Sequence, residues 1–189
     1  ARSQYLNCTR RRTGTAPPSN RNPETQPHQR RAMETTRHFT ATVYIVNDGA
    51  AALHYHPKLG IHVPPGGHVD RDELPHEAGL RETREETGLE PSLVDDTDPV
   101  GAPAGETLPR PREQLLYDID GDDGTVYHQH IDHVYFATVP SRAIDPEPGE
   151  AGVDAWEWYD REELRAADID PDTTALALRA IEAAENRER

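Results

Sequence analysis

Three glutamates within five residues are the strongest chemical signal in the sequence: Glu82, Glu85 and Glu86. A helix turns by about 100° per residue, so a helix here would place all three carboxylates within an arc of roughly 100°. Two carboxylates about 4 Å apart repel by roughly 1 kcal/mol in water and about 4 kcal/mol where partly buried. A divalent cation between the carboxylates makes their clustering favourable. Carboxylate oxygens suit Mg²⁺ or Mn²⁺ better than zinc. An exposed helix with ion pairs such as Arg81–Glu85 explains the residue types equally well.

The flanking residues predict that these glutamates lie on a helix from Pro75 to Gly88. Proline is favoured at the first helical position, and glycine is favoured as a terminator. One side of this helix is expected to pack on a sheet: Leu80, Thr83 and Thr87. The small residues Ala78 and Gly79 are expected to form the floor of the acidic face. A glycine in mid-helix costs about 1 kcal/mol against alanine, so something should need close approach there.

Strand signals surround this helix. Runs rich in β-branched and aromatic residues predict strands over 38–46, 52–56, 61–63, 113–119, 125–139 and 154–159. The sequences NDG (47–49) and GDDG (121–124) predict hairpin turns, and the proline-rich stretch 91–111 predicts a loop. A short helix from residue 161 and a helix over 171–186 complete the pattern. Interleaved strands and helices predict an α/β or α+β domain.

Charge is distributed unevenly along the 189 residues. Residues 33–189 hold 13 basic and 34 acidic residues, a net charge of −21. A body this acidic repels nucleic acid and anionic membranes, so neither is expected as a partner. Lys58 is the only lysine, and this pattern resembles proteins from halophiles, whose molar salt shortens the Debye length to roughly 3 Å. A mildly acidic protein from a GC-rich genome is the alternative.

Residues 1–32 are polar and rich in arginine, so they predict a disordered tail ahead of a folded domain over 33–189. A transit peptide, a nucleic-acid arm and an upstream extension before Met33 all fit this segment. The sequence shows no signal-peptide pattern and no apolar run long enough for a membrane helix. The single cysteine, Cys8, favours a reducing compartment, so a cytoplasmic location is expected.

The spacing around the glutamates is more specific than their number. Gly67 is followed after five residues by Glu73 and after seven more by Arg81–Leu89, which reads RETREETGL. This resembles the Nudix box, G-x5-E-x7-R-E-U-x-E-E-x-G-U with U aliphatic, at eight of its nine specified positions. Thr83 departs from the aliphatic U, which affects core packing more than chemistry. With the flanking elements, the resemblance extends over roughly residues 37–186.

The resemblance implies an α/β/α sandwich around a mixed β-sheet. It also implies Mg²⁺- or Mn²⁺-dependent hydrolysis of a diphosphate that links a nucleoside to another group. The implied metal ligands are three side chains and backbone near a glycine: Glu82, Glu85, Glu86 and Gly67. Arg81 and Glu73 are implied to form an ion pair that orients the catalytic helix.

A catalytic base in such enzymes is either a box glutamate, here Glu82 or Glu85, or an acid on a later loop. Glu150 is our candidate on the loop. It follows a Pro-Gly turn and precedes the strand 154–159, which we expect to run beside the catalytic helix. An acid on a mobile loop can reach the attacking water once substrate binds.

Histidines in the first part of the predicted strand 125–139 are a weaker signal. His128 and His130 share one face of that strand, which is the spacing that a metal would need, and His133 lies nearby. Ordinary sheet residues that face a cleft are the favoured interpretation. We expect His68, His130 and Asp132 to line the substrate pocket.

The expected substrates are nucleotide sugars, ADP-ribose-like compounds or oxidised nucleoside triphosphates. A Nudix module without catalytic activity, which senses a nucleotide and regulates a partner, is the alternative. Every acidic position of the box is present, and this favours the enzyme. Homodimers are common in the family, so a homodimer is one expectation for this chain.

Overall fold

The computed structural model describes residues 35–57, 59–120 and 126–187. They belong to a compact unit that spans Met33–Arg189. Residues 1–32, predicted as a tail, and the predicted turn at 121–124 lie outside the described residues. The tail therefore stays a prediction.

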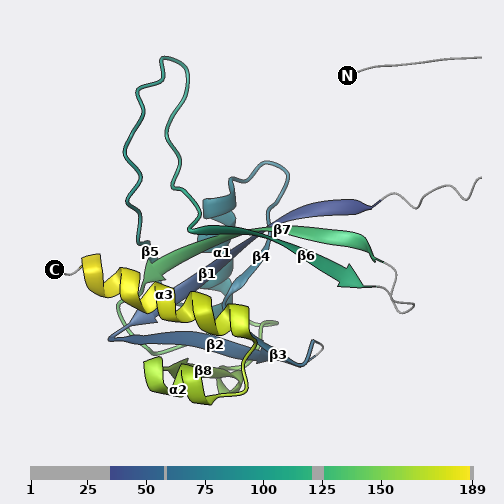
Figure 1. The fold of residues 1–189 in the computed structure, drawn as a ribbon, viewed down its shortest axis with the longest axis vertical. Helices are drawn as coiled ribbons and strands as arrows, with labels where there is room; N and C mark the ends of the chain where they lie inside the picture. The colour runs from purple at the N-terminus through teal and green to yellow at the C-terminus, as the bar shows by residue number, and fades with distance from the viewer. Residues whose placement is uncertain (1–34, 58, 121–125, 188–189) are drawn as a thin grey trace, which may run out of the picture. The chain divides into compact units, whose positions relative to one another are not determined.

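Along the described chain, α1 separates two runs of strands, and α2 and α3 follow the last strand (Figure 1). The strands are β1 (Thr36–Asn47), β2 (Ala50–His56), β3 (Ile61–Val63), β4 (Gly66–His68), β5 (Ser92–Leu93), β6 (Glu113–Asp120), β7 (Val126–Thr138) and β8 (Trp156–Tyr159). The helices are α1 (Pro75–Thr87), the 3-10 turn η1 (Val153–Ala155), α2 (Arg161–Ala166) and α3 (Pro171–Arg187). The predicted strands and helices are confirmed with ends within two residues, whereas β4 and β5 were not predicted.

The strands form one mixed sheet with the order β3-β2-β1-β7-β5. β1 and β7 run parallel in register from Thr36 opposite His128 to Val46 opposite Thr138. β4 pairs with the middle of β1, β6 pairs with β7 as the predicted hairpin, and β8 pairs with β2. The middle of β1 therefore lies between β4 and β7.

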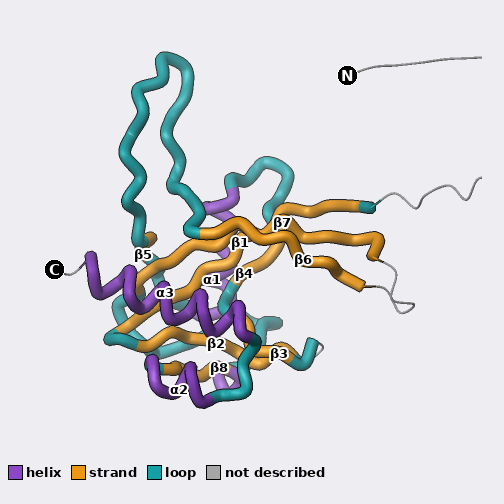
Figure 2. Tube along the Cα trace, viewed as in Figure 1, coloured by secondary structure: helices purple, strands orange, loops and turns teal. Residues whose placement is uncertain are grey.

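Alternation of side chains gives this sheet two apolar faces. On one face, Val43 and Ile45 of β1 pack in a cluster with Ala78 of α1. On the other face, Tyr44 and Val46 of β1 pack in a cluster with α3. Figure 2 shows α3 in front of the sheet and α1 behind it. The described residues thus form the α/β/α sandwich that the resemblance implies.

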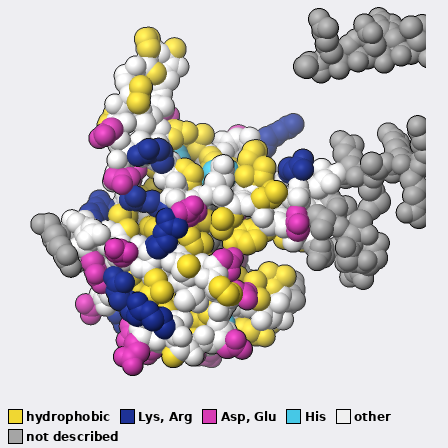
Figure 3. All heavy atoms as spheres, in the orientation of Figure 1, with side chains coloured by type: hydrophobic (Ala, Val, Ile, Leu, Met, Phe, Trp, Pro, Cys, Tyr) yellow, Lys and Arg dark blue, Asp and Glu magenta, His cyan; other side chains and the backbone are white. Residues whose placement is uncertain are grey.

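The surface in front of this sheet carries mixed side chains. Figure 3 shows hydrophobic groups around β6, where Leu116 is exposed, and both charge signs around α2 and α3. Two ion pairs join the acids of this region to its arginines: Arg161–Glu185 and Arg179–Glu113. None of the described helices is long and apolar enough to cross a membrane.

Candidate active site

Helix α1 lies directly against β1. It begins at Pro75 and ends before Gly88, whose positive φ of 67° suits a glycine. A Cβ atom built on Gly79 would lie 2.7 Å from Cγ2 of Val43, so the glycine lets the helix approach the strand. Ala78 is also fully buried. Our expectation that these small residues form the floor of the acidic face is therefore wrong, because they face the sheet.

Two threonines fill the rest of the buried side of α1. Thr83 and Thr87 are fully buried, as expected. The Thr83 hydroxyl donates to the Gly79 carbonyl at 2.7 Å, so threonine replaces the aliphatic residue of the box without an unpaired buried hydroxyl. Leu80 was expected on this side, but it is only half-buried and lies with Arg84 along a surface pocket.

Arg81 is the centre of the polar contacts on α1. Its guanidinium makes two bonds to the Glu73 carboxylate, at 2.9 and 3.0 Å. Its Nη1 atom donates to Glu82 at 2.9 Å and to Glu85 at 3.0 Å. Its Nη2 atom donates to the backbone carbonyl of His68 at 3.3 Å. One side chain therefore holds two box glutamates in place and ties the helix to β4.

Glu86 is the most buried of the three clustered glutamates. Its Oε2 atom accepts the backbone N–H of Gly66 at 3.3 Å. Burial raises the pKa of Glu86 to about 8, and the charge of Glu82 adds to the shift. Burial also raises the pKa of Glu82. Negative charge at these two carboxylates is thus unfavourable until a cation approaches.

Gly67 brings β4 against the same carboxylates. A Cβ atom on Gly67 would overlap the Glu82 carboxylate, so only glycine permits this contact. The three box carboxylates and the Gly67 backbone thus form an oxygen-rich group, and Mg²⁺ and Mn²⁺ favour such ligands. The residues present fit a divalent cation of that kind.

A loop over residues 144–150 covers the C-terminal end of α1. The backbone N–H of Asp145 donates to the Thr87 carbonyl at 2.9 Å, and that of Glu147 donates to the Glu85 carbonyl at 2.8 Å. Carbonyls in the last turn of a helix have no partner within the helix, so these bonds fix the loop on it.

This loop places Glu150 near the box carboxylates. Glu150 is exposed, and its charge adds to the raised pKa values of Glu82 and Glu86, after the larger effect of burial. The strand β8 was expected beside the helix, but it pairs with β2. The loop, rather than the strand, therefore brings Glu150 to the site.

The three residues expected to line the substrate pocket lie on β4 and β7. Asp132 is 5% exposed and accepts hydrogen bonds from Thr40 at 2.8 Å and Thr42 at 3.0 Å. Burial raises the pKa of Asp132. His68 and His130 lie together in one group of histidines.

Two histidines depart from the sequence interpretation. His133 is outside this group and instead contacts Gln114 across the β6–β7 pair, at 2.9 Å. His38, at the start of β1, belongs to the group but was not singled out. Nothing in its local sequence marks it, because it meets the other histidines only through strand pairing.

Comparison with known proteins agrees with this geometry. A model of the NUDIX domain matches residues 36–178. A NUDIX family hydrolase from Clostridium perfringens is 33% identical, and the match covers 78% of this chain and 97% of that chain with a TM-score of 0.62.

Two MutT protein structures share the fold at lower identity. Those from Bacillus halodurans and Methanosarcina mazei are each 17% identical, with TM-scores of 0.53. The matches cover 76% and 82% of this chain, and 82% and 99% of theirs. Comparison with curated proteins gives no match. The family match over residues 36–178, the Clostridium relative and the site geometry show that this chain belongs to the NUDIX family, as a pyrophosphohydrolase.

Proposed function

We propose that this enzyme hydrolyses a diphosphate that links a nucleoside to another group, using Mg²⁺ or Mn²⁺ held by Glu82, Glu85, Glu86 and the Gly67 backbone. The observation that carries the proposal is the state of Glu86. Burial raises its pKa to about 8, and its described partner is only a backbone N–H. Arg81, in contrast, is engaged by Glu82 and Glu85.

A bound divalent cation neutralises diphosphate charge and lowers the pKa of an attacking water. The residues of the chain have separate tasks around it. Arg81 positions Glu82 and Glu85, and Glu73 holds Arg81 through its paired bonds. We assign to Glu150 the removal of a proton from water, because its loop is fixed on the last turn of α1.

The nucleoside part of the substrate is proposed to lie across β4. Gly66 and Gly67 carry no side chains, and in the described residues β4 pairs only with β1. A chain of phosphates can therefore pass this edge from the glutamates toward Asp132. ADP-ribose-like compounds, nucleotide sugars and oxidised nucleoside triphosphates all have this two-part form.

Product analysis with a nucleotide panel tests this function. With Mg²⁺, hydrolysis of ADP-ribose should give AMP and ribose phosphate, whereas hydrolysis of a triphosphate between its α and β phosphates should give a monophosphate and pyrophosphate. Addition of EDTA should abolish turnover. A protein that binds one of these nucleotides and hydrolyses none with Mg²⁺ or Mn²⁺ would instead be the regulatory module.

We also propose that the protein works in a cytoplasm of high salt. The support is the net charge of −21 over residues 33–189 and the near absence of lysine. Screening of self-repulsion should raise the melting temperature and the activity between low and molar KCl. A flat or falling melting temperature over that range would contradict this proposal.

A further inference from the structure

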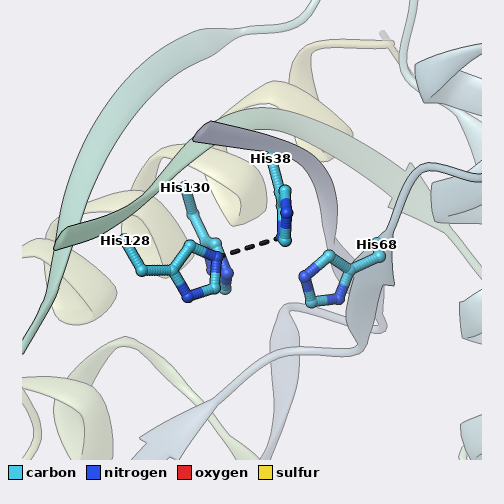
Figure 4. A group of neighbouring side chains, drawn as sticks. All are labelled: His38, His68, His128 and His130. Carbon is cyan, nitrogen blue, oxygen red and sulfur yellow. Dashed lines mark hydrogen bonds between the residues drawn. The ribbon is translucent and has the colours of Figure 1, made fainter. Parts of the chain in front are cut away.

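Four histidines gather around a common point on three strands of the sheet (Figure 4). His38 comes from β1, His68 from β4, and His128 and His130 from β7. One ring nitrogen from each lies within 4.8 Å of the others. We call these four residues the histidine tetrad.

Strand pairing explains why the tetrad forms. In the parallel pair of β1 and β7, His38 lies opposite His130. On the other side of β1, His68 lies opposite Thr40. Because side chains alternate along β4, His68 and the position of Gly67 point to opposite faces. Gly67 faces Glu82 of α1, so the tetrad lies on the face away from the box glutamates.

One nitrogen of the tetrad has no hydrogen-bond partner among the described residues. The Nε2 atom of His130 is buried and makes no hydrogen bond with any residue that the structure describes. Buried polar atoms are nearly always hydrogen-bonded, and an unpaired one destabilises a fold by about 1–3 kcal/mol. This atom therefore indicates a ligand, and the other three rings show where that ligand would lie.

A second contact shows that two other ring nitrogens of the tetrad lie close together. Nε2 of His128 and Nδ1 of His38 are 3.0 Å apart, and Figure 4 shows this contact as a dashed line. Two imidazole nitrogens approach this closely only when a proton lies between them. A metal ion can take the place of that proton and bind both lone pairs.

Most ring pairs of the tetrad meet edge to face, whereas the His38 and His130 rings are nearly parallel with centroids 6.4 Å apart. His38 and His128 meet edge to face with centroids 4.5 Å apart, and His68 and His130 do so at 4.9 Å. The donors of the tetrad are all nitrogens, whereas those of the box are oxygens. Imidazole suits zinc, cobalt, nickel and copper, whereas Mg²⁺ and Mn²⁺ prefer oxygen.

We propose that the tetrad binds one Zn²⁺ ion, in a site separate from the box glutamates. Zinc–nitrogen bonds of about 2.0–2.1 Å place tetrahedral ligand atoms about 3.3–3.4 Å apart. Rotation of exposed His38 and His68 can close the present spacing of at most 4.8 Å. Four protein ligands make a closed structural site, which would join β1, β4 and β7. This proposal does not depend on which nucleotide the enzyme hydrolyses.

Zinc content after equilibrium dialysis tests the site in the full-length protein. The assay uses a Glu82→Gln/Glu86→Gln background with excess Mg²⁺, so that the box does not take up zinc. We expect one Zn²⁺ per chain, and Co²⁺ in its place should give the intense visible absorption of a four-coordinate ion. His38→Gln and His130→Gln should each lower zinc affinity at least about 100-fold, since even second-shell partners contribute 10–100-fold.

His133→Asn is the matched control, because His133 lies on β7 but outside the tetrad. It should keep the zinc, and zinc should raise its melting temperature as it does for the parent. His38 is exposed, so the His38→Gln protein should fold and lose only the rise in melting temperature that zinc causes.

Two results would overturn the proposal. In one, zinc stoichiometry and affinity are the same in the parent and in both tetrad variants. In the other, made on the unsubstituted background, His38→Gln raises the KM for nucleotide and leaves zinc binding intact. That second result would show that the tetrad contacts the substrate directly.

Discussion

The box glutamates and the histidine tetrad flank the same short strand, β4, but they are held in opposite ways. The three glutamates come from one helix, and Arg81 and the N–H of Gly66 already contact them. The tetrad comes from three strands, with His38 and His128 90 residues apart. One of its buried nitrogens has no partner in the part of the chain that the structure describes.

This difference separates two kinds of binding site. In the box, the protein supplies partial neutralisation and fixes the carboxylates before a cation arrives, as a catalytic site requires. In the tetrad, the ligand itself would complete the contacts and hold the strands together. Substitutions should therefore affect the box through reaction rate and the tetrad through metal content and stability.

The largest effect should come from Glu86→Gln. This change removes a proposed ligand and the charge that a divalent cation offsets, so kcat should fall by at least about 10³. Mg²⁺-dependent product release at saturating substrate measures it. Zinc binding by the tetrad should be unchanged.

Glu90→Gln is the control for that experiment, because Glu90 is an exposed glutamate just past the helix that pairs with Arg84. It should keep nearly full activity. Full Mg²⁺-dependent activity in Glu86→Gln would remove Glu86 from the metal site.

The next effect should come from Glu150→Gln, which lacks the proposed base. We expect kcat to fall by about 10²–10³, the usual range for the loss of an acid–base group. The pH–rate profile should also lose its acidic limb. Glu147→Gln is a matched control on the same loop, because Glu147 holds the helix through its backbone N–H. If Glu85→Gln rather than Glu150→Gln loses that limb, the base lies in the box.

The box could be predicted from sequence because its side chains lie on one helix. Proline and glycine mark the ends of α1, and a fixed rotation per residue brings Glu82, Glu85 and Glu86 together. The strands were predictable for a similar reason, since turns and β-branched runs are local signals. Gly79 was misread because periodicity could not show that Val43 would press on the helix at that point.

The tetrad could not be predicted, because it depends on register between distant strands. His38 lies beside His130 only because β1 and β7 run parallel in that register. A shift of one residue would send the two rings to opposite faces. The pair His128 and His130 was visible as an alternating pattern, but ordinary sheet residues were the favoured interpretation of that pattern.

A smaller effect should come from Gly67→Ala, which separates the two sites most directly. The added Cβ would overlap the Glu82 carboxylate, so kcat should fall about 10–100-fold as that group is displaced. The neighbouring His68 points to the other face, so zinc affinity should stay within a few-fold of the parent. Gly101→Ala is the control, since a Cβ there meets open space. Loss of activity and zinc together would show that the sites are coupled through β4.

The smallest effect concerns His54, the other histidine with an unpaired buried nitrogen. Its Nδ1 atom makes no hydrogen bond within residues 35–57, 59–120 and 126–187, and its ring meets Trp156 edge to face. No described cluster of metal-binding side chains includes it. His54 therefore tests whether an unpaired nitrogen alone signals a ligand. We expect His54 to bind no zinc with an affinity like that of the tetrad. Its burial should affect only the pH dependence of stability.

The sign of that dependence follows from the pKa of His54, which burial lowers to about 4, with help from His56 and His62. An unfolded histidine has a pKa of about 6.5, so the folded state binds the proton less readily. The contribution of neutral His54 to the free energy of unfolding is therefore fully present above about pH 6.5 and is lost as the pH drops toward about 4. The free energy of unfolding in urea should fall between pH 7.5 and pH 5. That fall should be about 1–2 kcal/mol larger in the parent than in His54→Phe, after allowance for solvent screening. His133→Asn should keep the parent's loss, and equal losses in parent and His54→Phe would mean that His54 is not buried in its neutral form.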